Sequence, residues 1–291
     1  MSASPTSATV DRYVVIGNPV AHSKSPAIHA RFAAQTAQAL DYQRLLAPLD
    51  GFVASVLAFR DGGGKGANVT VPFKLEAFTL ANRLTPRAQV AGAVNTLRFD
   101  GGEIFGDNTD GIGLVNDIVG NAGCSLHGKR LLLLGAGGAA RGALLPLLEQ
   151  MPAELVIANR TLAKAQELAT LAQSVMASGA CANVPVLAST LSELQQTFDI
   201  IINATSASLH DDVPPIPVSV FQPKTLAYDM MYGTRPTAFL QLAALHGADC
   251  RDGLGMLVEQ AAEAFLCWRG VRPETSQLLA DLRADLQKEL T

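Results

Sequence analysis

The stretch from Leu131 to Thr161 limits the fold of this chain more than any other. Leu131 to Leu134 is apolar at every position, which is typical of a parallel strand covered on both faces. A glycine-rich turn follows at once, and Leu155 to Ala158 predicts a second strand after an intervening helix. Strand, glycine turn, helix and strand in this order indicate a βαβ unit that binds a dinucleotide.

The glycine turn itself supports this interpretation. Gly135 permits a tight turn, Gly137 lets the backbone approach a pyrophosphate, and the small Ala140 allows close helix packing. The helix that begins there directs its N–H groups at the phosphate. A glycine cluster alone is weak evidence, because many such clusters are ordinary turns. Here the flanking strands and helix favour the dinucleotide site.

The residues after the second strand predict which dinucleotide is bound. An NAD site usually has Asp or Glu there, whereas this chain has Asn159-Arg160-Thr161, with Lys164 one helical turn further on. An amide, a guanidinium and a hydroxyl can bind a 2′-phosphate that a carboxylate would repel. At about 1.5–3 kcal/mol for each charge-assisted bond, two contacts give a preference for NADP of roughly a hundred-fold or more. The alternative is a helix N-cap with solvated cations.

Length and composition indicate a soluble globular protein of two domains. The chain has 291 residues, of which 48% are hydrophobic and 16% charged. The net charge of −4 and the lack of a basic stripe argue against nucleic acid as a partner. No apolar run is long enough to span a membrane, and residues 1–12 lack the order of a signal peptide. We therefore expect a cytoplasmic location.

Neither cysteine nor histidine spacing predicts a metal site. The four cysteines are scattered without a C-x-x-C pair, so we interpret them as free thiols in a reducing compartment. His22 lies in a loop with no second histidine or acid at ligand spacing, which favours a structural role.

Three polar features in the first 112 residues suggest a ligand site. Ser25 followed by Pro26 predicts a helix start with Ser25 as N-cap; together with Ser23, it could instead bind a small anion. Lys74 opens a helix, although the helix dipole disfavours cations there. Asp110 follows a predicted hairpin and opens another helix, where it is also a capping candidate.

Strands and helices alternate along the chain, so we predict an α/β fold with two domains. A substrate-binding α/β domain with a mainly parallel sheet would comprise residues 1–112 and 250–291, and an inserted Rossmann-type NADP-binding domain would comprise residues 113–249. Within the latter, a buried strand leads into the Asn203–Ser206 loop, where ligands bind in open α/β sheets. Gly253-Leu254-Gly255 predicts a hinge-like turn before a helix from Met256 to Trp268.

Several motifs occur together in one order, and their combination closely resembles the shikimate dehydrogenases of the shikimate/quinate dehydrogenase family over nearly the whole chain. They are Gly17-Asn18-Pro19 to Pro26, Asn68 to Lys74, Gly92 to Thr96, Gly106 to Gly111, Gly135 to Arg141, Asn159 to Thr161, Asn203 to Ser206 and Gly253 to Gln260. The resemblance implies an NADP-dependent oxidoreductase that reversibly reduces 3-dehydroshikimate to shikimate in chorismate and aromatic amino-acid biosynthesis. It also implies a small-molecule substrate and allows a homodimer.

The resemblance also assigns roles to residues of this chain. It implies Lys74 and Asp110 as the catalytic pair. The residues that it implies for substrate binding are Ser23, Ser25, Thr70, Lys74, Asn95, Asp110, Tyr232 and Gln260. Those implied for NADP binding are Gly135, Ala136, Gly137, Gly138, Ala139, Asn159, Arg160, Thr161, Lys164, Met230 and Gly253.

The chain departs from the family pattern at three positions. Ala30 stands where many members have asparagine, Lys164 where arginine is common, and Pro86 where an acidic residue near the cofactor is often assigned. These departures concern secondary contacts of the cofactor and leave the implied chemistry intact.

Other interpretations of the same residues remain open at this point. Lys74 could form a surface ion pair, and Asp110 could cap a helix. The nearest functional alternative is a quinate/shikimate dehydrogenase that accepts either nucleotide. A further alternative is a non-catalytic NADP-sensing module on the same fold, against which the presence of both Lys74 and Asp110 counts.

Overall fold

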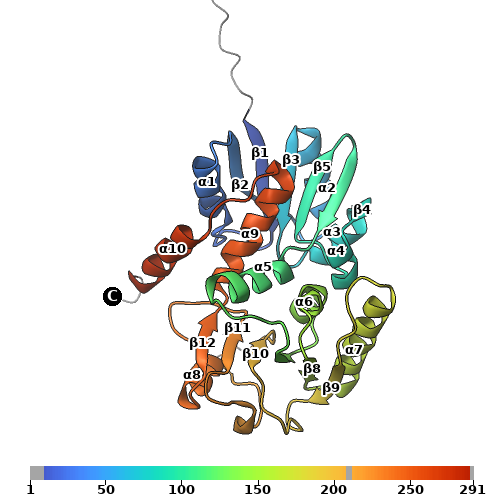
Figure 1. Ribbon diagram of the computed structural model, residues 1–291. Coiled ribbons are helices and arrows are strands. Elements are labelled where there is room, and N and C mark those ends of the chain that lie inside the picture. The colour runs from blue at the N-terminus through green and yellow to red at the C-terminus, as the bar shows by residue number, and fades with distance from the viewer. Residues whose placement is uncertain (1–9, 208–211, 289–291) are drawn as a thin grey trace, which may run out of the picture. The chain divides into compact units, whose positions relative to one another are not determined.

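The structure is a computed structural model that describes residues 10–207 and 212–288. The chain forms two compact units (Figure 1). Unit 1 consists of Met1–Ala88, Ala93–Asn108 and Ala261–Leu278. Unit 2 consists of Gln89–Gly92, Thr109–Gln260 and Leu279–Thr291. The helices α9 (Leu254–Arg269) and α10 (Ser276–Lys288) each have residues in both units.

Among the described residues, unit 1 is built on a six-stranded sheet with the order β2-β1-β3-β5-β6-β4. Its strands are β1 (Asp11–Gly17), β2 (Leu40–Leu46), β3 (Gly64–Val69), β4 (Arg83–Leu84), β5 (Thr96–Asp100) and β6 (Glu103–Asp107). Strand β1 pairs in parallel with β2 and β3, and β5 and β6 form the predicted antiparallel hairpin. Its helices are α1 (Ser25–Gln35), α2 (Phe52–Asp61), α3 (Lys74–Leu80) and, with its last residues in unit 2, α4 (Pro86–Ala91).

Strand β1 shows how unit 1 covers its sheet. Val14 and Ile16 pack into one apolar cluster with residues of α2 and α3, whereas Tyr13 and Val15 pack into another with Tyr42. Because successive side chains of a strand point to opposite faces, β1 is buried on both faces.

His29 is a buried polar residue on the second of these faces. Its side chain stacks on Tyr42 with ring centroids 4.3 Å apart, and neither ring nitrogen has a hydrogen-bond partner within the described residues. Burial lowers the pKa of His29 to about 3, so the imidazole is neutral in the folded protein at neutral pH.

This burial predicts a pH dependence of stability. The unfolded chain protonates His29 near its ordinary pKa of about 6.5, whereas the folded protein resists protonation down to a pKa of about 3. The contribution of His29 to the free energy of unfolding is therefore fully present above pH 6.5. It is lost as the pH falls below that value, by up to about 1.4 kcal/mol per pH unit. We therefore expect the unfolding free energy, measured with urea between pH 4 and pH 8, to fall less steeply toward low pH in His29→Leu than in the wild type. Equal slopes would contradict the prediction.

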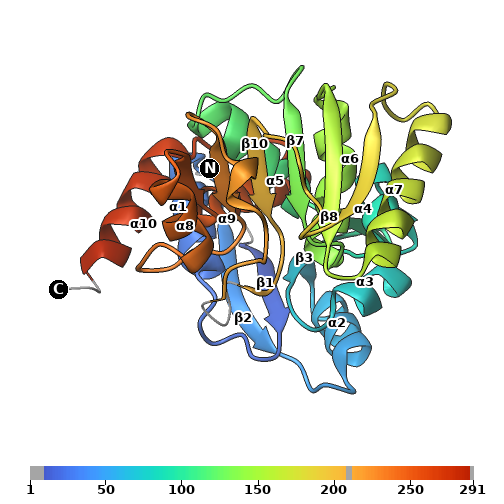
Figure 2. The ribbon, with the colours of Figure 1, turned by 90° about the horizontal axis from the view of Figure 1, so that it is seen from below.

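Among the described residues, unit 2 is built on a second six-stranded sheet, in which all pairings are parallel and the order is β12-β11-β10-β7-β8-β9. Its strands are β7 (Arg130–Leu134), β8 (Glu154–Asn159), β9 (Val186–Thr190), β10 (Ile200–Asn203), β11 (Leu226–Asp229) and β12 (Asp249–Asp252). In chain order this is the 3-2-1-4-5-6 arrangement of a Rossmann fold. Figure 2 shows β10, β7 and β8 side by side.

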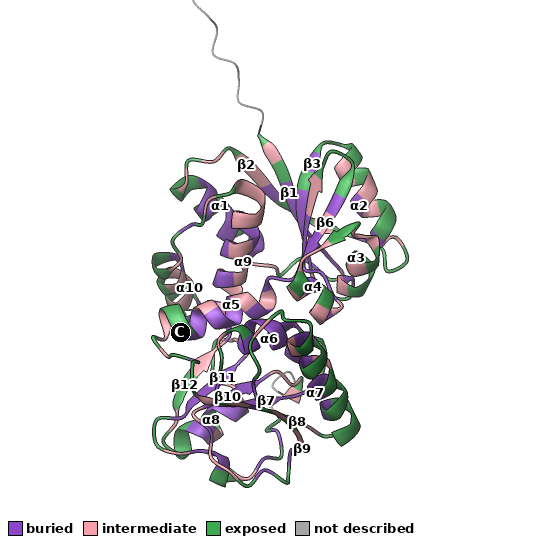
Figure 3. Cartoon of the chain, turned by 45° about the vertical axis from the view of Figure 1, so that its right-hand side comes forward, coloured by how far each residue is buried: buried purple, intermediate pink, exposed green. Residues whose placement is uncertain are grey.

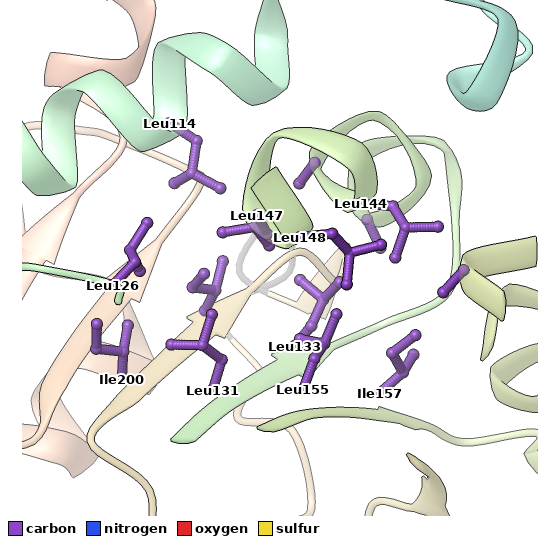
Figure 4. Packing of buried hydrophobic residues seen from close by; sticks show 14 of the residues in the cluster. Leu114, Leu126, Leu131, Leu133, Leu144, Leu147, Leu148, Leu155, Ile157 and Ile200 are labelled. Atoms are coloured by element: carbon purple, nitrogen blue, oxygen red, sulfur yellow. The ribbon is translucent and has the colours of Figure 1, made fainter. Parts of the chain in front are cut away.

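The helices of unit 2 cover this sheet with apolar side chains. They include α5 (Asp110–Asn116), the π-helical turn η1 (Asp117–Asn121), α6 (Gly138–Glu149), α7 (Leu162–Ala177) and α8 (Ala238–Leu245). Leu131 and Leu133 pack with Leu144 and Leu147 of α6, as Figure 4 shows, whereas Leu132 faces a second cluster. Helix α7 buries one stripe of side chains and exposes most of its other side chains (Figure 3).

Two local predictions were wrong. Helix α1 begins at Ser25 itself, so the N-cap position falls on Lys24, which makes no side-chain capping bond within the described part of the chain. Of the predicted turn at Gly253-Leu254-Gly255, only Gly253 lies in a turn, because α9 begins at Leu254. A Cβ on Gly253 would overlap the Met230 carbonyl oxygen and one on Gly255 the Asp117 carboxylate, so both glycines allow close packing.

Candidate functional site

The carboxyl edge of the parallel sheet in unit 2 gathers the residues predicted to bind NADP. Because the strands are parallel, their carboxyl ends lie along one edge. Gly135 follows β7, Asn159 ends β8, Asn203 ends β10, Met230 follows β11 and Gly253 follows β12. From β7 the strand order runs to one side of the sheet through β8 and β9, and from β10 to the other side through β11 and β12. Ligands bind in open α/β sheets at such a point, which here lies between β7 and β10.

The glycine turn after β7 has the geometry that a phosphate site needs. Gly135 has φ of +101°, and a Cβ there would lie 3.1 Å from the Ala204 carbonyl oxygen, so a larger residue would be strained. Gly137, the N-cap of α6, is exposed and has open space around it, while Ala140 is fully buried. The first turn of α6 thus presents backbone N–H groups to solvent.

The turn after β8 presents the cationic side chains. Asn159 is half-buried, and its side-chain amide donates to the Thr161 carbonyl at 2.9 Å, which orders the turn. Arg160, Thr161 and Lys164 are exposed. Thr161 occupies the N-cap position of α7 without a side-chain capping bond in the described chain, so the hydroxyl does not act as the helix cap.

A buried amide–carboxylate pair, which the sequence analysis missed, organises the loops after β10 and β11. Asn203 and Asp229 are fully buried, and the Asn203 amide donates to the Asp229 carboxylate at 3.1 Å. Asn203 Oδ1 accepts from the Thr205 N–H, and Asp229 Oδ1 accepts from the Met231 N–H. The sequence held one signal for this pair: the strand Leu226–Asp229, which is otherwise apolar, ends in a carboxylate.

Met230 and Gly253 meet at this edge. The Gly253 N–H donates to the Met231 carbonyl at 3.0 Å, and a Cβ on Gly253 would overlap the Met230 carbonyl oxygen. Tyr232 follows in the same loop and is half-buried. Burial, together with Asp252, raises the pKa of the Tyr232 hydroxyl, which stays a proton donor at neutral pH.

Two residues predicted to bind substrate lie on packed helices of unit 2. Asp110 is the first residue of α5 and is half-buried, and Gln260 lies on α9. A Cβ on Gly113 would lie 2.7 Å from the Gln260 backbone nitrogen, so this glycine lets the helices approach closely. The Thr109 hydroxyl lies 3.4 Å from Gln260 Oε1.

Unit 1 gathers a second set of predicted residues beyond the ends of β1 and β3. The Ser25 N–H donates to Ser23 Oγ at 3.3 Å, and Ser25 is buried. The Thr70 N–H donates to the Ile16 carbonyl at 2.9 Å, and a Cβ on Gly17 would overlap the Thr70 methyl group.

Lys74 and Asn95 are anchored to this set through the backbone. The Lys74 carbonyl accepts from the Val94 N–H at 2.9 Å, and the Asn95 carbonyl accepts from the Val69 N–H at 2.7 Å. Lys74 is half-buried, and Asn95 is almost fully buried. The Thr96 hydroxyl donates to Asn95 Oδ1 at 2.9 Å, which orients the Asn95 amide.

The two predicted catalytic residues belong to different units, Lys74 to unit 1 and Asp110 to unit 2. Their pairing therefore stays a prediction. His22 is exposed, and the described residues contain no group of three or more His, Cys, Asp or Glu placed to hold a metal ion. No helix within these residues is long and apolar enough to cross a membrane.

The sheet order and its glycine turn define a protein with a Rossmann-type dinucleotide-binding unit. Three family models match the chain: the shikimate dehydrogenase substrate binding domain at residues 15–97, shikimate/quinate 5-dehydrogenase at 114–210, and the shikimate 5'-dehydrogenase C-terminal domain at 253–280. A relative from Herminiimonas arsenicoxydans, named shikimate dehydrogenase (NADP(+)), is 62% identical over 96% of this chain and 100% of its own length. The chain belongs to the shikimate dehydrogenase family.

Solved structures agree with this assignment. An Ael1 enzyme from Pseudomonas putida superposes with a TM-score of 0.86 at 51% identity, covering 94% of this chain and 98% of its own. Shikimate 5-dehydrogenase from Thermus thermophilus in complex with NADP(H) and shikimate superposes with a TM-score of 0.80 at 32% identity, covering 94% and 99%.

Proposed function

We propose that the protein catalyses the reversible NADP-dependent reduction of 3-dehydroshikimate to shikimate, a step of aromatic amino-acid biosynthesis. The observation that carries the proposal is the 62% identity, over 96% of the chain, to a relative named shikimate dehydrogenase (NADP(+)). The carboxyl edge of unit 2 supports NADP as the cofactor, because it combines an open glycine turn with the exposed Arg160 and Lys164.

The chemistry requires a proton donor beside the substrate carbonyl. When bound, NADPH supplies a hydride to the carbonyl carbon, which leaves negative charge on the oxygen. Lys74, as an ammonium, donates a proton to that oxygen; in the reverse direction its neutral amine accepts the hydroxyl proton. Asp110 orients Lys74 and accepts a hydrogen bond from a substrate hydroxyl. This pairing requires Lys74 of unit 1 and Asp110 of unit 2 to meet around the substrate.

The remaining predicted residues bind different groups of the substrate. Ser23, Ser25 and Tyr232 have hydroxyl groups that can donate to the substrate carboxylate. Thr70, Asn95 and Gln260 would bind the ring hydroxyls. The close placement of Ser23 and Ser25, and of Thr70 near the end of β1, supports this division.

The functional domains that we propose are residues 1–112 with 250–291 for the substrate and residues 113–249 for NADP. We further propose that the enzyme works in the cytoplasm and forms a homodimer, without nucleic acid or a membrane as partner. Size-exclusion chromatography with light scattering would decide the oligomeric state.

The activity is tested by the absorbance of the reduced nicotinamide, with shikimate and quinate each assayed against NADP⁺ and NAD⁺. We expect rapid reduction of NADP⁺ with shikimate and little with quinate or NAD⁺. Comparable turnover of quinate would favour a broader quinate/shikimate dehydrogenase, in keeping with the name of the matching family model. Binding of NADP⁺ without turnover of either acid would favour a non-catalytic sensing module.

A further inference from the structure

A buried carboxylate that has no part in the proposed function lies close to the candidate NADP edge. Asp117 begins the π-helical turn η1 and is fully buried. The Arg251 guanidinium donates to both of its oxygens, Nε to Oδ2 at 2.8 Å and an Nη to Oδ1 at 2.5 Å. The Tyr228 hydroxyl donates to Oδ2 at 2.8 Å, and the Asn121 amide donates to Oδ1 at 2.9 Å.

This carboxylate lies against the first turn of α9. A Cβ on Gly255 would overlap the Asp117 carboxylate, so only glycine allows the approach. A negative charge is favourable at a helix N-terminus, where the backbone N–H groups carry partial positive charge. The Leu254 N–H donates to the Asp252 carboxylate at 3.2 Å, and Asp117 lies against Gly255 in the same turn, where its negative charge is favourable.

The two main partners of Asp117 lie on the strands that lead to Met230 and Gly253. Tyr228 lies on β11, two residues before Met230, and Arg251 lies on β12, two residues before Gly253. Gly253 and Met230 are in backbone contact beyond the strand ends. A shift of either partner would therefore change the placement of this contact.

A purely structural ion pair is the simpler explanation of the cluster. A buried pair of this kind contributes little net stability compared with apolar packing, because both charges must be desolvated. The π-helical turn that Asp117 begins is a rare element, and such turns occur frequently at functional sites. The position of the cluster, between α5 and the strands that precede Met230 and Gly253, favours a role in the site.

We propose that Asp117 is a positioning residue for the nicotinamide half of NADP: through Tyr228 and Arg251 it holds the Met230 and Gly253 segments in register. This inference rests on the proposed function and on the family resemblance, which implies that Met230 and Gly253 bind NADP. A Rossmann sheet has two mononucleotide-binding halves, so with the 2′-phosphate at the turn after β8, the ends of β11 and β12 would face the nicotinamide half. The adenosine half would depend on the glycine turn after β7 and on Arg160, whereas the side chain of Asp117 bonds to Arg251, Tyr228 and Asn121.

The test separates the two halves of the cofactor by calorimetric titration with NADP⁺ and with adenosine 2′,5′-bisphosphate, which lacks the nicotinamide. We expect Asp117→Asn to raise the Kd for NADP⁺ about ten-fold and to leave the Kd for the bisphosphate within about two-fold. Tyr228→Phe, which keeps the Asp117–Arg251 pair, should shift the Kd for NADP⁺ in the same direction by a smaller factor.

Arg269→Met is the matched control, because Arg269 also pairs with a carboxylate, Asp11, but in unit 1. It should leave both Kd values unchanged. If Asp117→Asn does not fold, the Tyr228→Phe variant decides the question. Equal Kd values for NADP⁺ in the wild type and Tyr228→Phe, or a parallel loss of both ligands in Asp117→Asn, would overturn the proposal. Failure of the wild type to bind NADP⁺ would instead contradict the proposed function.

Discussion

Replacement of Lys74 with alanine is expected to lower kcat for shikimate oxidation by about 10²–10⁴-fold, because the reaction loses its general acid–base group. The side chain is half-buried at the start of α3, and the backbone around it is held by the bond from Val94 to the Lys74 carbonyl, which the substitution keeps. We therefore expect the fold to be retained. Steady-state kinetics, with circular dichroism as the check on folding, measure the effect.

The control for this variant is Lys65→Ala, which removes an exposed lysine from β3 of the same unit. It should leave kcat unchanged. Binding of NADP⁺ to Lys74→Ala should also be close to normal, because the residues proposed for the cofactor belong to unit 2. A folded Lys74→Ala enzyme with near-normal kcat would show that the proton is transferred by another group.

The second large effect is expected at Arg160. The wild type should prefer NADP⁺ over NAD⁺, and Arg160→Asp should lower that preference, expressed as the ratio of the two kcat/KM values, by about a hundred-fold or more. The physical reason is that one charge-assisted bond to the 2′-phosphate is lost and a repulsive carboxylate is introduced. Arg160 is exposed, so the substitution should cost little stability.

Arg160→Gln separates the two contributions, because it removes the attraction without adding a negative charge. We expect its preference to lie between those of the wild type and Arg160→Asp. A wild type that prefers NAD⁺, or an unchanged ratio in Arg160→Asp, would mean that the turn after β8 does not bind the 2′-phosphate.

The sheet of unit 2 was predictable because its signals are local. The apolar run Leu131 to Leu134 and the glycine turn after it are consecutive in the chain, and β7 and α6 form where they were expected. The same holds for the hairpin of β5 and β6. Local signals did not reveal why position 255 is glycine, because the group that a Cβ there would overlap is a carboxylate from a distant segment, Asp117.

For the candidate site, the motifs predicted residues and roles; the structure shows where the residues lie, and the roles stay predictions. The motifs indicated Gly135, Arg160 and Lys74, and the structure places Gly135 and Arg160 at one sheet edge. Asp229 and Asn203 were not predicted as partners, because an acid at the end of a strand looks the same whether it is solvated or buried.

By itself, the sequence determined the α/β pattern, the parallel sheet of unit 2 and the family resemblance, because hydrophobic periodicity and glycine placement act over a few neighbouring residues. Only the tertiary structure decided which buried polar groups meet, such as Asp117 with Arg251 and Asn203 with Asp229. These partners are far apart in the chain. Most buried polar groups have a hydrogen-bond partner, and the fold decides which one lies within reach.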